Sequence, residues 1–500
     1  MLFMLPVVAA MAPVAVVVAE AVAMAPTVAG AVEHAATVLH AAEAVAGAAT
    51  ALIAVAADRM EMSFSPRLSD NVFYSNKEDK HLFLNPDLPD WVVLNQNATY
   101  VVAQFDGKKT VTDIISSIEQ DGAVFKQNDV VELIKQLSRH GIIDDAIAPA
   151  IINNCKCLQT DNPKLHLVHI KLTDECNLSC KYCYAESGST HKKFMSLEEL
   201  KSVVDKVGAI ATGVDFTLSG GEPLLHPSAL ELMEYIKSVG GNIFLLTNGL
   251  MINNANAQKI TKLCSLIKIS IDGSCEEINS ITRGRHSFDG ALNGYTLLKN
   301  EGANVQVSMT VTKANINDIQ NMTNMFGNRL TLQPFFKAGR GTDNEYLQIT
   351  GKEYYEAMAK IEGFKPIGRI GELLETLRRN GMSKCAMADA EISISENGDV
   401  FPCQLLAEDE LRGGNIKHDS LQDILNSEVF KKAASFSSLT NEGCSTCPIK
   451  LLCGGACRAR SYLETGSLFV NSDFCEYEQL AYINGIFDSV SFGGKNEANI

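Results

Sequence analysis

The sequence predicts an α/β protein built around a parallel sheet that curves into a partial (β/α)6 barrel. Between residues 165 and 340, six apolar strand patterns alternate with helical patterns, which is typical of right-handed βαβ units. Three short strands followed by three helices come before this region and predict a winged-helix-like α+β module. After residue 385 the chain is rich in cysteine, which predicts a metal-binding extension.

Composition and charge indicate a globular chain of several domains. It has 500 residues, of which 46% are hydrophobic, and 43 Lys and Arg against 59 Asp and Glu give a net charge of −16. Nucleic-acid binders concentrate Lys and Arg to neutralise phosphates, so we expect no nucleic-acid partner. The 14 cysteines are clustered, and in a long chain without a secretory signal such clusters indicate metal ligands before disulfides.

The first 62 residues have an unusual composition. They are mostly Ala, Val, Met and Pro, and no Lys or Arg precedes Arg59. A signal peptide needs a basic start, and the apolar residues 1–19 are interrupted by Pro6 and Pro13 and have no basic flank to orient them in a bilayer. We therefore expect residues 1–62 to be a low-complexity extension, with no membrane insertion, and we expect a cytoplasmic protein.

Residues 63–145 predict the α+β module. Its strand patterns cover residues 71–74, 81–84 and 91–94, and its helical patterns cover residues 97–104, 112–119 and 128–140. We expect Asn97 to cap the first helix. The module has no catalytic constellation of its own. Residues 146–164, which carry Cys155 and Cys157, predict a linker.

Residues 165–340 predict the barrel. Its strand patterns cover residues 169–172, 214–218, 243–246, 267–271, 305–311 and 330–335. Its helical patterns cover residues 197–210, 228–239, 255–264, 291–300 and 316–326. Because chemistry in such folds lies at the C-terminal ends of the strands, we expect the site there. Residues 341–384 predict connecting helices.

Three cysteines follow the first strand of the barrel. Cys176, Cys180 and Cys183 have the spacing C-x3-C-x2-C on one loop. Soft sulfur ligands suit an iron–sulfur cluster, and three of them leave one iron of a four-iron cluster free. Zinc is the alternative, but a structural zinc site takes four protein ligands and the loop has no nearby fourth Cys or His.

A glycine-rich motif ends the second strand. It reads Ser219-Gly220-Gly221-Glu222-Pro223. Glycines let a backbone approach a ligand closely, and a carboxylate can hold an ammonium group. A simple turn from strand to helix is the alternative. The position of the motif, one βα unit after the cysteine loop, makes it informative.

Together these motifs resemble those of the radical S-adenosylmethionine (SAM) superfamily, from about residue 165 onward. The resemblance implies that Cys176, Cys180 and Cys183 bind a [4Fe–4S] cluster and that SAM chelates its fourth iron. It places Tyr182 beside the adenine and makes Arg283 a candidate for the SAM carboxylate. Each polar position also has an alternative as a turn or cap residue. The implied SAM contacts are Tyr182, Ser219, Gly220, Gly221, Glu222, Thr247, Asn248, Ser270, Asp272 and Arg283.

The resemblance also implies the reaction. The reduced cluster passes one electron to SAM, and a 5′-deoxyadenosyl radical then abstracts a hydrogen atom from the substrate. An electron donor such as flavodoxin or ferredoxin is implied. The protein would hold the reacting hydrogen close and exclude water and oxygen.

Seven cysteines in residues 385–485 resemble the SPASM extension, and residues 486–500 form a tail. The resemblance implies two auxiliary [4Fe–4S] clusters, and therefore three clusters in the chain. The outer cluster would be held by Cys444, Cys447, Cys453 and Cys475, and the inner cluster by Cys385, Cys403 and Cys457. The inner cluster lacks a fourth cysteine, so either Cys155, Cys157 or another residue completes it, or one iron is open. A pair of zinc knuckles is the alternative.

The module of residues 63–145 is similar to PqqD-like recognition elements of ribosomal peptide biosynthesis. Such elements add a leader peptide to a sheet edge, here implied beside residues 91–94 and helix 128–140. We therefore expect a maturase that crosslinks a ribosomal precursor peptide, with a Cys thioether of the sactionine type favoured. Carbon–carbon or carbon–oxygen crosslinking, formylglycine formation and a non-catalytic metal-binding peptide adaptor are the alternatives.

Overall fold

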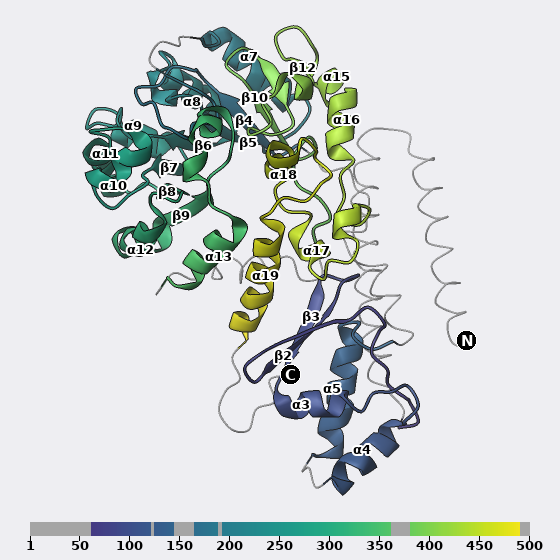
Figure 1. Ribbon diagram of the computed structural model, residues 1–500. Helices are drawn as coiled ribbons and strands as arrows, with labels where there is room; N and C mark the ends of the chain where they lie inside the picture. Colours follow the sequence, from purple (N-terminus) through teal and green to yellow (C-terminus); the bar gives the residue numbers. More distant parts are fainter. Residues whose placement is uncertain (1–61, 122–124, 145–164, 189–192, 362–380, 491–500) are drawn as a thin grey trace, which may run out of the picture. The chain divides into compact units, whose positions relative to one another are not determined.

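The computed structural model describes residues 62–121, 125–144, 165–188, 193–361 and 381–490 (Figure 1). The predicted extension and linker, including Cys155 and Cys157, lie outside the described residues. The described chain divides into two compact units, residues 62–85 with 94–144, and residues 86–93 with those from 165 onward. No helix in these ranges is long and apolar enough to cross a membrane.

The N-terminal sheet has the strand order β1-β2-β3. Its strands are β1 (Phe73–Lys77), β2 (Lys80–Asn85) and β3 (Asp90–Leu94), and the helices α3 (Gln96–Val102), α4 (Val111–Gln120) and α5 (Gln127–Arg139) follow. The predicted order of three strands and three helices is therefore observed. The expectation that Asn97 caps α3 is wrong, because the Asn95 side chain accepts a hydrogen bond from the Ala98 N–H at 2.9 Å.

The large sheet contains the six predicted barrel strands side by side and parallel. They are β4 (Leu167–Lys171), β5 (Asp215–Ser219), β6 (Asn242–Thr247), β7 (Leu266–Ser270), β8 (Val305–Val311) and β9 (Leu330–Pro334). Because sequential strands are neighbours and all parallel, each connection is a βα crossover. The predicted partial barrel is confirmed.

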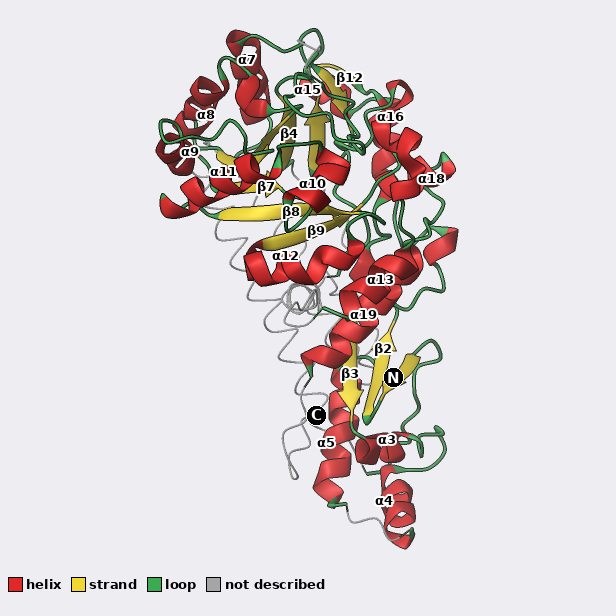
Figure 2. Cartoon of the chain, turned by 60° about the vertical axis from the view of Figure 1, so that its left-hand side comes forward, coloured by secondary structure: helices red, strands yellow, loops and turns green. Residues whose placement is uncertain are grey.

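Five predicted helices lie on the outer side of these strands (Figures 1 and 2). They are α7 (Leu197–Gly208), α8 (Ala229–Ser238), α9 (Ala257–Leu263), α11 (Phe288–Asn300) and α12 (Ile319–Phe326). A further helix, α10 (Glu276–Arg283), was not predicted. Its buried residues are Asn279, Thr282 and Arg283, so the buried face of this helix is polar.

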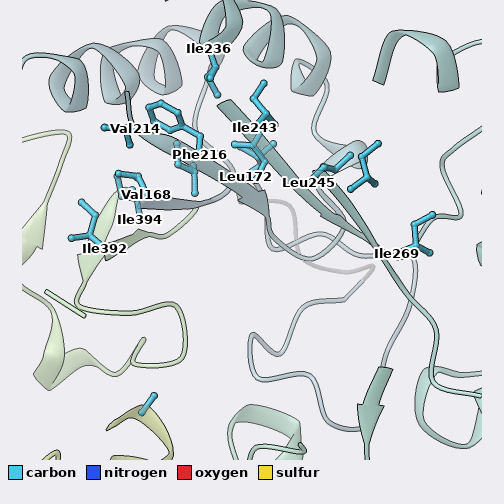
Figure 3. Packing of buried hydrophobic residues seen from close by; sticks show 14 of the residues in the cluster. Val168, Leu172, Val214, Phe216, Ile236, Ile243, Leu245, Ile269, Ile392 and Ile394 are labelled. Atoms are coloured by element: carbon cyan, nitrogen blue, oxygen red, sulfur yellow. The ribbon is translucent and has the colours of Figure 1, made fainter. Parts of the chain in front are cut away.

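The main hydrophobic core lies between the sheet and the outer helices (Figure 3). Successive side chains of a strand point to opposite faces, so alternate residues enter this core. The strand residues Val168, Phe216, Ile243, Leu245 and Ile269 are buried in it. The opposite, inner face of the same strands carries polar residues such as His169, Thr217 and Ser219.

The cysteine-rich region continues the same sheet. Its strands β10 (Glu391–Ile394), β11 (Asp399–Phe401) and β12 (Gly414–Asn415) extend the sheet beyond β4, in the order β12-β11-β10-β4. β10 is parallel to β4, with Ser393 opposite His169. Ile392 and Ile394 join the core of the barrel (Figure 3). The region thus shares a sheet and a core with the barrel.

Short helices make up most of the remaining C-terminal region. They are α13 (Gly351–Ala359), α15 (Leu421–Leu425), α16 (Glu428–Ala434), α17 (Lys450–Cys453), α18 (Arg458–Thr465) and α19 (Cys475–Ser489). α13 packs against α19, where the Tyr354 and Tyr477 ring centroids are 5.0 Å apart. Three of these helix ends carry cysteines of the predicted clusters.

Candidate active site

The three-cysteine loop lies at the C-terminal end of β4, as predicted. Cys176 is buried, and Cys180 and Cys183 are half-buried. The three thiols are close enough to influence one another electrostatically. Burial raises the pKa of Cys180 to about 12, and the Arg283 guanidinium acts in the opposite direction. Metal ligation needs the thiolate, so a bound cation must replace the proton, and an all-sulfur set suits iron.

Arg340 holds the backbone of this loop. It lies in the 3-10 segment η5 (Gly339–Leu347), which begins soon after β9. Its Nε donates to the Cys180 carbonyl at 2.9 Å and its Nη1 to the Ser187 carbonyl at 2.8 Å. Asn344 of the same segment donates to the Lys181 carbonyl at 3.0 Å. Sequence reasoning missed Arg340, although its place after the sixth strand was an available signal.

The glycine motif packs directly on the cysteine loop. Gly221 N–H donates to the Thr173 carbonyl at 2.7 Å, and Glu222 N–H donates to the Glu175 carbonyl at 2.8 Å. A Cβ on Gly221 would lie 2.1 Å from the Glu175 oxygen and 2.9 Å from Cys176 Cβ. The glycines predicted to admit a ligand therefore admit the chain's own backbone.

Glu222 joins the ends of β5 and β6. It is fully buried and accepts hydrogen bonds from Thr247 Oγ1 at 2.7 Å, Asn248 N at 2.8 Å and Leu224 N at 3.2 Å. Burial raises its pKa to about 7, although these three donors act to lower it. The Asn248 side-chain amide donates to Asn177 Oδ1 at 2.7 Å, which ties β6 to the cysteine loop.

Asp272, at the end of β7, lies at the centre of a second cluster of polar side chains. The fully buried carboxylate accepts hydrogen bonds from the Tyr182 hydroxyl at 2.5 Å and Thr282 Oγ1 at 2.9 Å. Arg283 forms an ion pair with it at 2.9 Å and lies 5.6 Å from the Tyr182 ring centroid. The ion pair places Arg283 beside the cysteine loop. Ser270, the remaining predicted contact on β7, is half-buried.

Ser219 belongs to a different group from the other motif residues. Its hydroxyl forms hydrogen bonds with His169 Nε2 and with the Tyr184 hydroxyl. Burial lowers the pKa of His169 to about 4, so its imidazole is neutral. Tyr184 is 36% exposed and lies near both Cys183 and Cys403. Sequence reasoning did not single out His169 or Tyr184, because neither belongs to a motif.

Four C-terminal cysteines line one cavity. Cys444, Cys447, Cys453 and Cys475 surround an empty volume of about 270 Å³, part of it open to solvent. Gln479 Nε2 donates to Cys447 Sγ at 3.3 Å, and Asn471 Nδ2 donates to Cys475 Sγ at 3.6 Å. Amide donors at ligating sulfurs stabilise the thiolate form. These are the four residues predicted to hold the outer cluster.

The other three C-terminal cysteines also lie near one another. Cys385 and Cys457 both act electrostatically on Cys403, and burial is the main cause that raises the pKa of each thiol. Glu391 of β10 raises the pKa of Cys385 and Cys403 further. Sequence reasoning did not single out Glu391. These three are the residues predicted to hold the inner cluster.

The donor sets fit clusters in composition, since each consists of cysteine sulfur alone. Among the described residues, no three His, Cys, Asp or Glu side chains are placed to hold a single metal ion. A single zinc ion would hold all its sulfur ligands about 2.3 Å from one point, whereas each cysteine of a four-iron cluster binds a different iron, so the cysteine sulfurs lie further apart.

Three protein-family models match the chain. The model of the radical SAM superfamily matches residues 170–326. The chain is a radical SAM enzyme. An iron–sulfur cluster-binding domain, SPASM, matches residues 385–448, and coenzyme PQQ synthesis protein D, PqqD, matches residues 80–143. This radical SAM enzyme therefore binds SAM and iron–sulfur clusters, and the alternative of a non-catalytic adaptor is wrong.

Known proteins resemble this radical SAM enzyme at low identity. The AdoMet-dependent heme synthase of Methanosarcina barkeri is 27% identical, over 64% of this chain and 97% of the relative. The antilisterial bacteriocin subtilosin biosynthesis protein AlbA of Bacillus subtilis is 26% identical, over 73% of this chain and 84% of the relative. The solved structure of anSMEcpe with bound AdoMet and Kp18Cys peptide has a TM-score of 0.54 at 21% identity. The match covers 65% of this chain and 99% of that chain, and it shows the same fold.

Gly339 is expected to be required for the shape of the cysteine loop. Its φ is +50°, and a Cβ there would lie 2.6 Å from the carbonyl oxygens of Cys183 and Tyr184. We expect Gly339→Ala to reduce 5′-deoxyadenosine formation about tenfold, equivalent to ~1.4 kcal/mol. Gly213→Ala is the matched control, since it has φ +70° and no atom within 4 Å of the added Cβ. Equal effects of the two substitutions would contradict the role of the close approach.

Glu222 predicts a pH dependence of stability. Its pKa in the folded chain, about 7, lies above the ordinary value of 4.5, so the folded state keeps a proton that the unfolded state loses. The free energy of unfolding should therefore fall as the pH rises through this window, by at most about 3 kcal/mol. Denaturant unfolding of the wild type and Glu222→Gln at several pH values checks this. Parallel pH profiles for the two proteins would contradict it.

Proposed function

We propose that the chain is a peptide maturase that modifies a ribosomally made precursor. The observation that carries this proposal is the PqqD-like element at residues 80–143, placed ahead of a radical SAM core and a SPASM domain. The similarity to AlbA, a bacteriocin biosynthesis protein that this chain covers over 84% of its length, supports a peptide substrate. The substrate would bind through residues 63–145 and react in residues 165–340.

The contacts of the core residues support the roles proposed for them. When bound, SAM and its cluster supply hydrogen-atom abstraction. Cys176, Cys180 and Cys183 would hold this cluster, and Arg340 keeps the loop in shape through the Cys180 carbonyl. Asp272 pairs with Arg283 and accepts a hydrogen bond from Tyr182 of the loop itself. The remaining predicted SAM contacts at β5 and β6 would orient the methionyl group, with Thr247 and Asn248 fixed by Glu222.

The leader peptide would add to the N-terminal sheet. The order β1-β2-β3 leaves β3 at one edge, and strand addition there supplies main-chain hydrogen bonds for affinity and side-chain pockets for register. α5 contributes an apolar stripe of Val130, Leu133, Ile134 and Leu137 to the interior of the module. This arrangement supports β3 as the sheet edge that the leader would use.

We propose a Cys thioether as the product. Two auxiliary clusters, held by the outer and inner cysteine sets, would take up the electron released when the bond closes. The inner set has three described cysteines, so an open iron there could hold a substrate thiolate. Carbon–carbon or carbon–oxygen crosslinking and formylglycine formation are the rival products. A thioether and a carbon–carbon or carbon–oxygen crosslink each remove two hydrogen atoms. Of these crosslinks, only the thioether makes the substrate cysteine resistant to alkylation.

The enzyme should cleave SAM reductively when it is reconstituted anaerobically with iron, sulfide and dithionite. We expect 5′-deoxyadenosine from the wild type and none above background from Cys176→Ala, because the loop then lacks one of its three sulfurs. Cys264→Ala is the matched control, since Cys264 lies at the end of α9, outside all three cysteine sets. Loss of the product in both variants, or in neither, would refute the assigned role of the loop.

Trp91 should report leader binding. It is the single tryptophan of the chain and lies on β3. We expect a candidate precursor peptide, synthesised with its leader, to change the Trp91 fluorescence in a saturable manner, because an added strand would pair next to this residue. The same peptide without its leader is the control. Saturable binding of the full-length peptide with an unchanged Trp91 signal would place the leader elsewhere.

A further inference from the structure

A buried arginine lies among the C-terminal cysteines. Arg458 begins α18 directly after Cys457, and it is 1% exposed. Its Nη1 donates to the Leu468 carbonyl at 3.2 Å and to the Val470 carbonyl at 3.5 Å. Its guanidinium lies 4.4 Å from the centroid of the Phe436 ring. The side chain is therefore held in place by carbonyl oxygens and by an aromatic face.

The positive charge of Arg458 has no carboxylate partner within the described part of the chain. No Asp or Glu there forms an ion pair with it, and its Nε is buried without a hydrogen-bond partner. Arg460, two residues later, is also buried but pairs with Glu464 at 3.4 Å. Burying an unpaired charge is unfavourable, so a negative group near Arg458 would stabilise the buried guanidinium.

Cysteines are the ionisable groups that face Arg458. Cys444, Cys453, Cys457 and Cys475 all act on it electrostatically. Three of them belong to the outer set and one to the inner set. As cluster ligands these residues are thiolates, and a ligated cluster is an anion. The fold thus places one uncompensated cation where the negative charge of the auxiliary clusters would lie.

We propose that Arg458 is a positioning residue for electron transfer. Its charge raises the reduction potentials of both auxiliary clusters, and it raises that of the outer cluster more. A reduced cluster carries one more negative charge than an oxidised one, so a nearby buried cation stabilises the reduced form. Three of the four cysteines facing Arg458 belong to the outer set, so the outer cluster gains more. An electron taken from the substrate then moves favourably from the inner to the outer cluster. This inference rests on the proposed auxiliary clusters.

Redox titration of the reconstituted enzyme, followed by electron paramagnetic resonance, tests this role. We expect Arg458→Met to shift the reduction equilibrium of the outer cluster at least tenfold toward the oxidised form, which for one electron is 59 mV. Arg458→Lys keeps the charge and should shift it less. Arg460→Met is the matched control, because the charge of Arg460 is already offset by Glu464. The reduction potential of the outer cluster should therefore shift less in Arg460→Met than in Arg458→Met.

Iron and sulfide contents separate the outcomes. If Arg458→Met holds the wild-type iron and titrates at the wild-type potential, the role of Arg458 is refuted while the auxiliary clusters stand. If Arg458→Met fails to assemble its clusters, Arg458→Gln, which still donates to carbonyl oxygens, decides by the same criterion. If the wild type itself holds iron for one cluster only, the proposed auxiliary clusters are refuted.

Discussion

The shape of the loop that carries Cys176, Cys180 and Cys183 is the constraint on which the site depends. The loop forms no helix or strand, but some backbone hydrogen bonds lie within it, such as that from Cys176 N–H to the Gly188 carbonyl at 3.2 Å. Other carbonyl oxygens of the loop accept hydrogen bonds from elsewhere in the barrel, above all from Arg340 and the Gly221 amide. The three cysteines would present their sulfur atoms to one cluster only when these hydrogen bonds hold the loop in shape.

The residues that hold the cysteine loop come from strand ends that are far apart in sequence. Asn248 after β6 reaches the loop through Asn177, and the Asp272 carboxylate after β7 reaches it through Tyr182. Asn248, Asp272 and Tyr182 are buried or half-buried, so a lost partner would leave a polar group without a hydrogen bond. The C-terminal ends of parallel strands meet at one edge, and this geometry brings the partners together.

Buried charge has a different role in the two halves of the enzyme. In the barrel, the Arg283 cation is matched by Asp272, and the pair supports the cysteine loop. In the cysteine-rich C-terminal region, Arg458 lacks such a carboxylate partner among the described residues and lies near four cysteines. A paired buried charge adds little net stability to the fold. The field of an unpaired buried charge is not cancelled by a partner, so it attracts nearby anions. The same residue type therefore stabilises one site and tunes the other.

Local patterns predicted the elements that have a simple physical signature. The barrel strands were found because apolar β-branched runs alternate with amphipathic helices. α10 was missed because its buried residues, among them Asn279 and Thr282, are polar, and the cap of α3 was misplaced because Asn95 and Asn97 are equally good caps by type. Arg340, His169 and Tyr184 were missed because only the folded barrel brings them to the site.

By itself the sequence determined that this is a radical SAM chain with extra cysteine sets, because thiolate spacing on one loop is a local property that ligand chemistry constrains. Only the tertiary structure decided what the neighbours of those residues are. It showed that Gly221 makes room for the loop's own backbone, that Arg283 is paired with Asp272, and that Cys475 shares a cavity with Cys444. Such partners are separated by many residues along the chain, so their contacts depend on how the strands and helices pack.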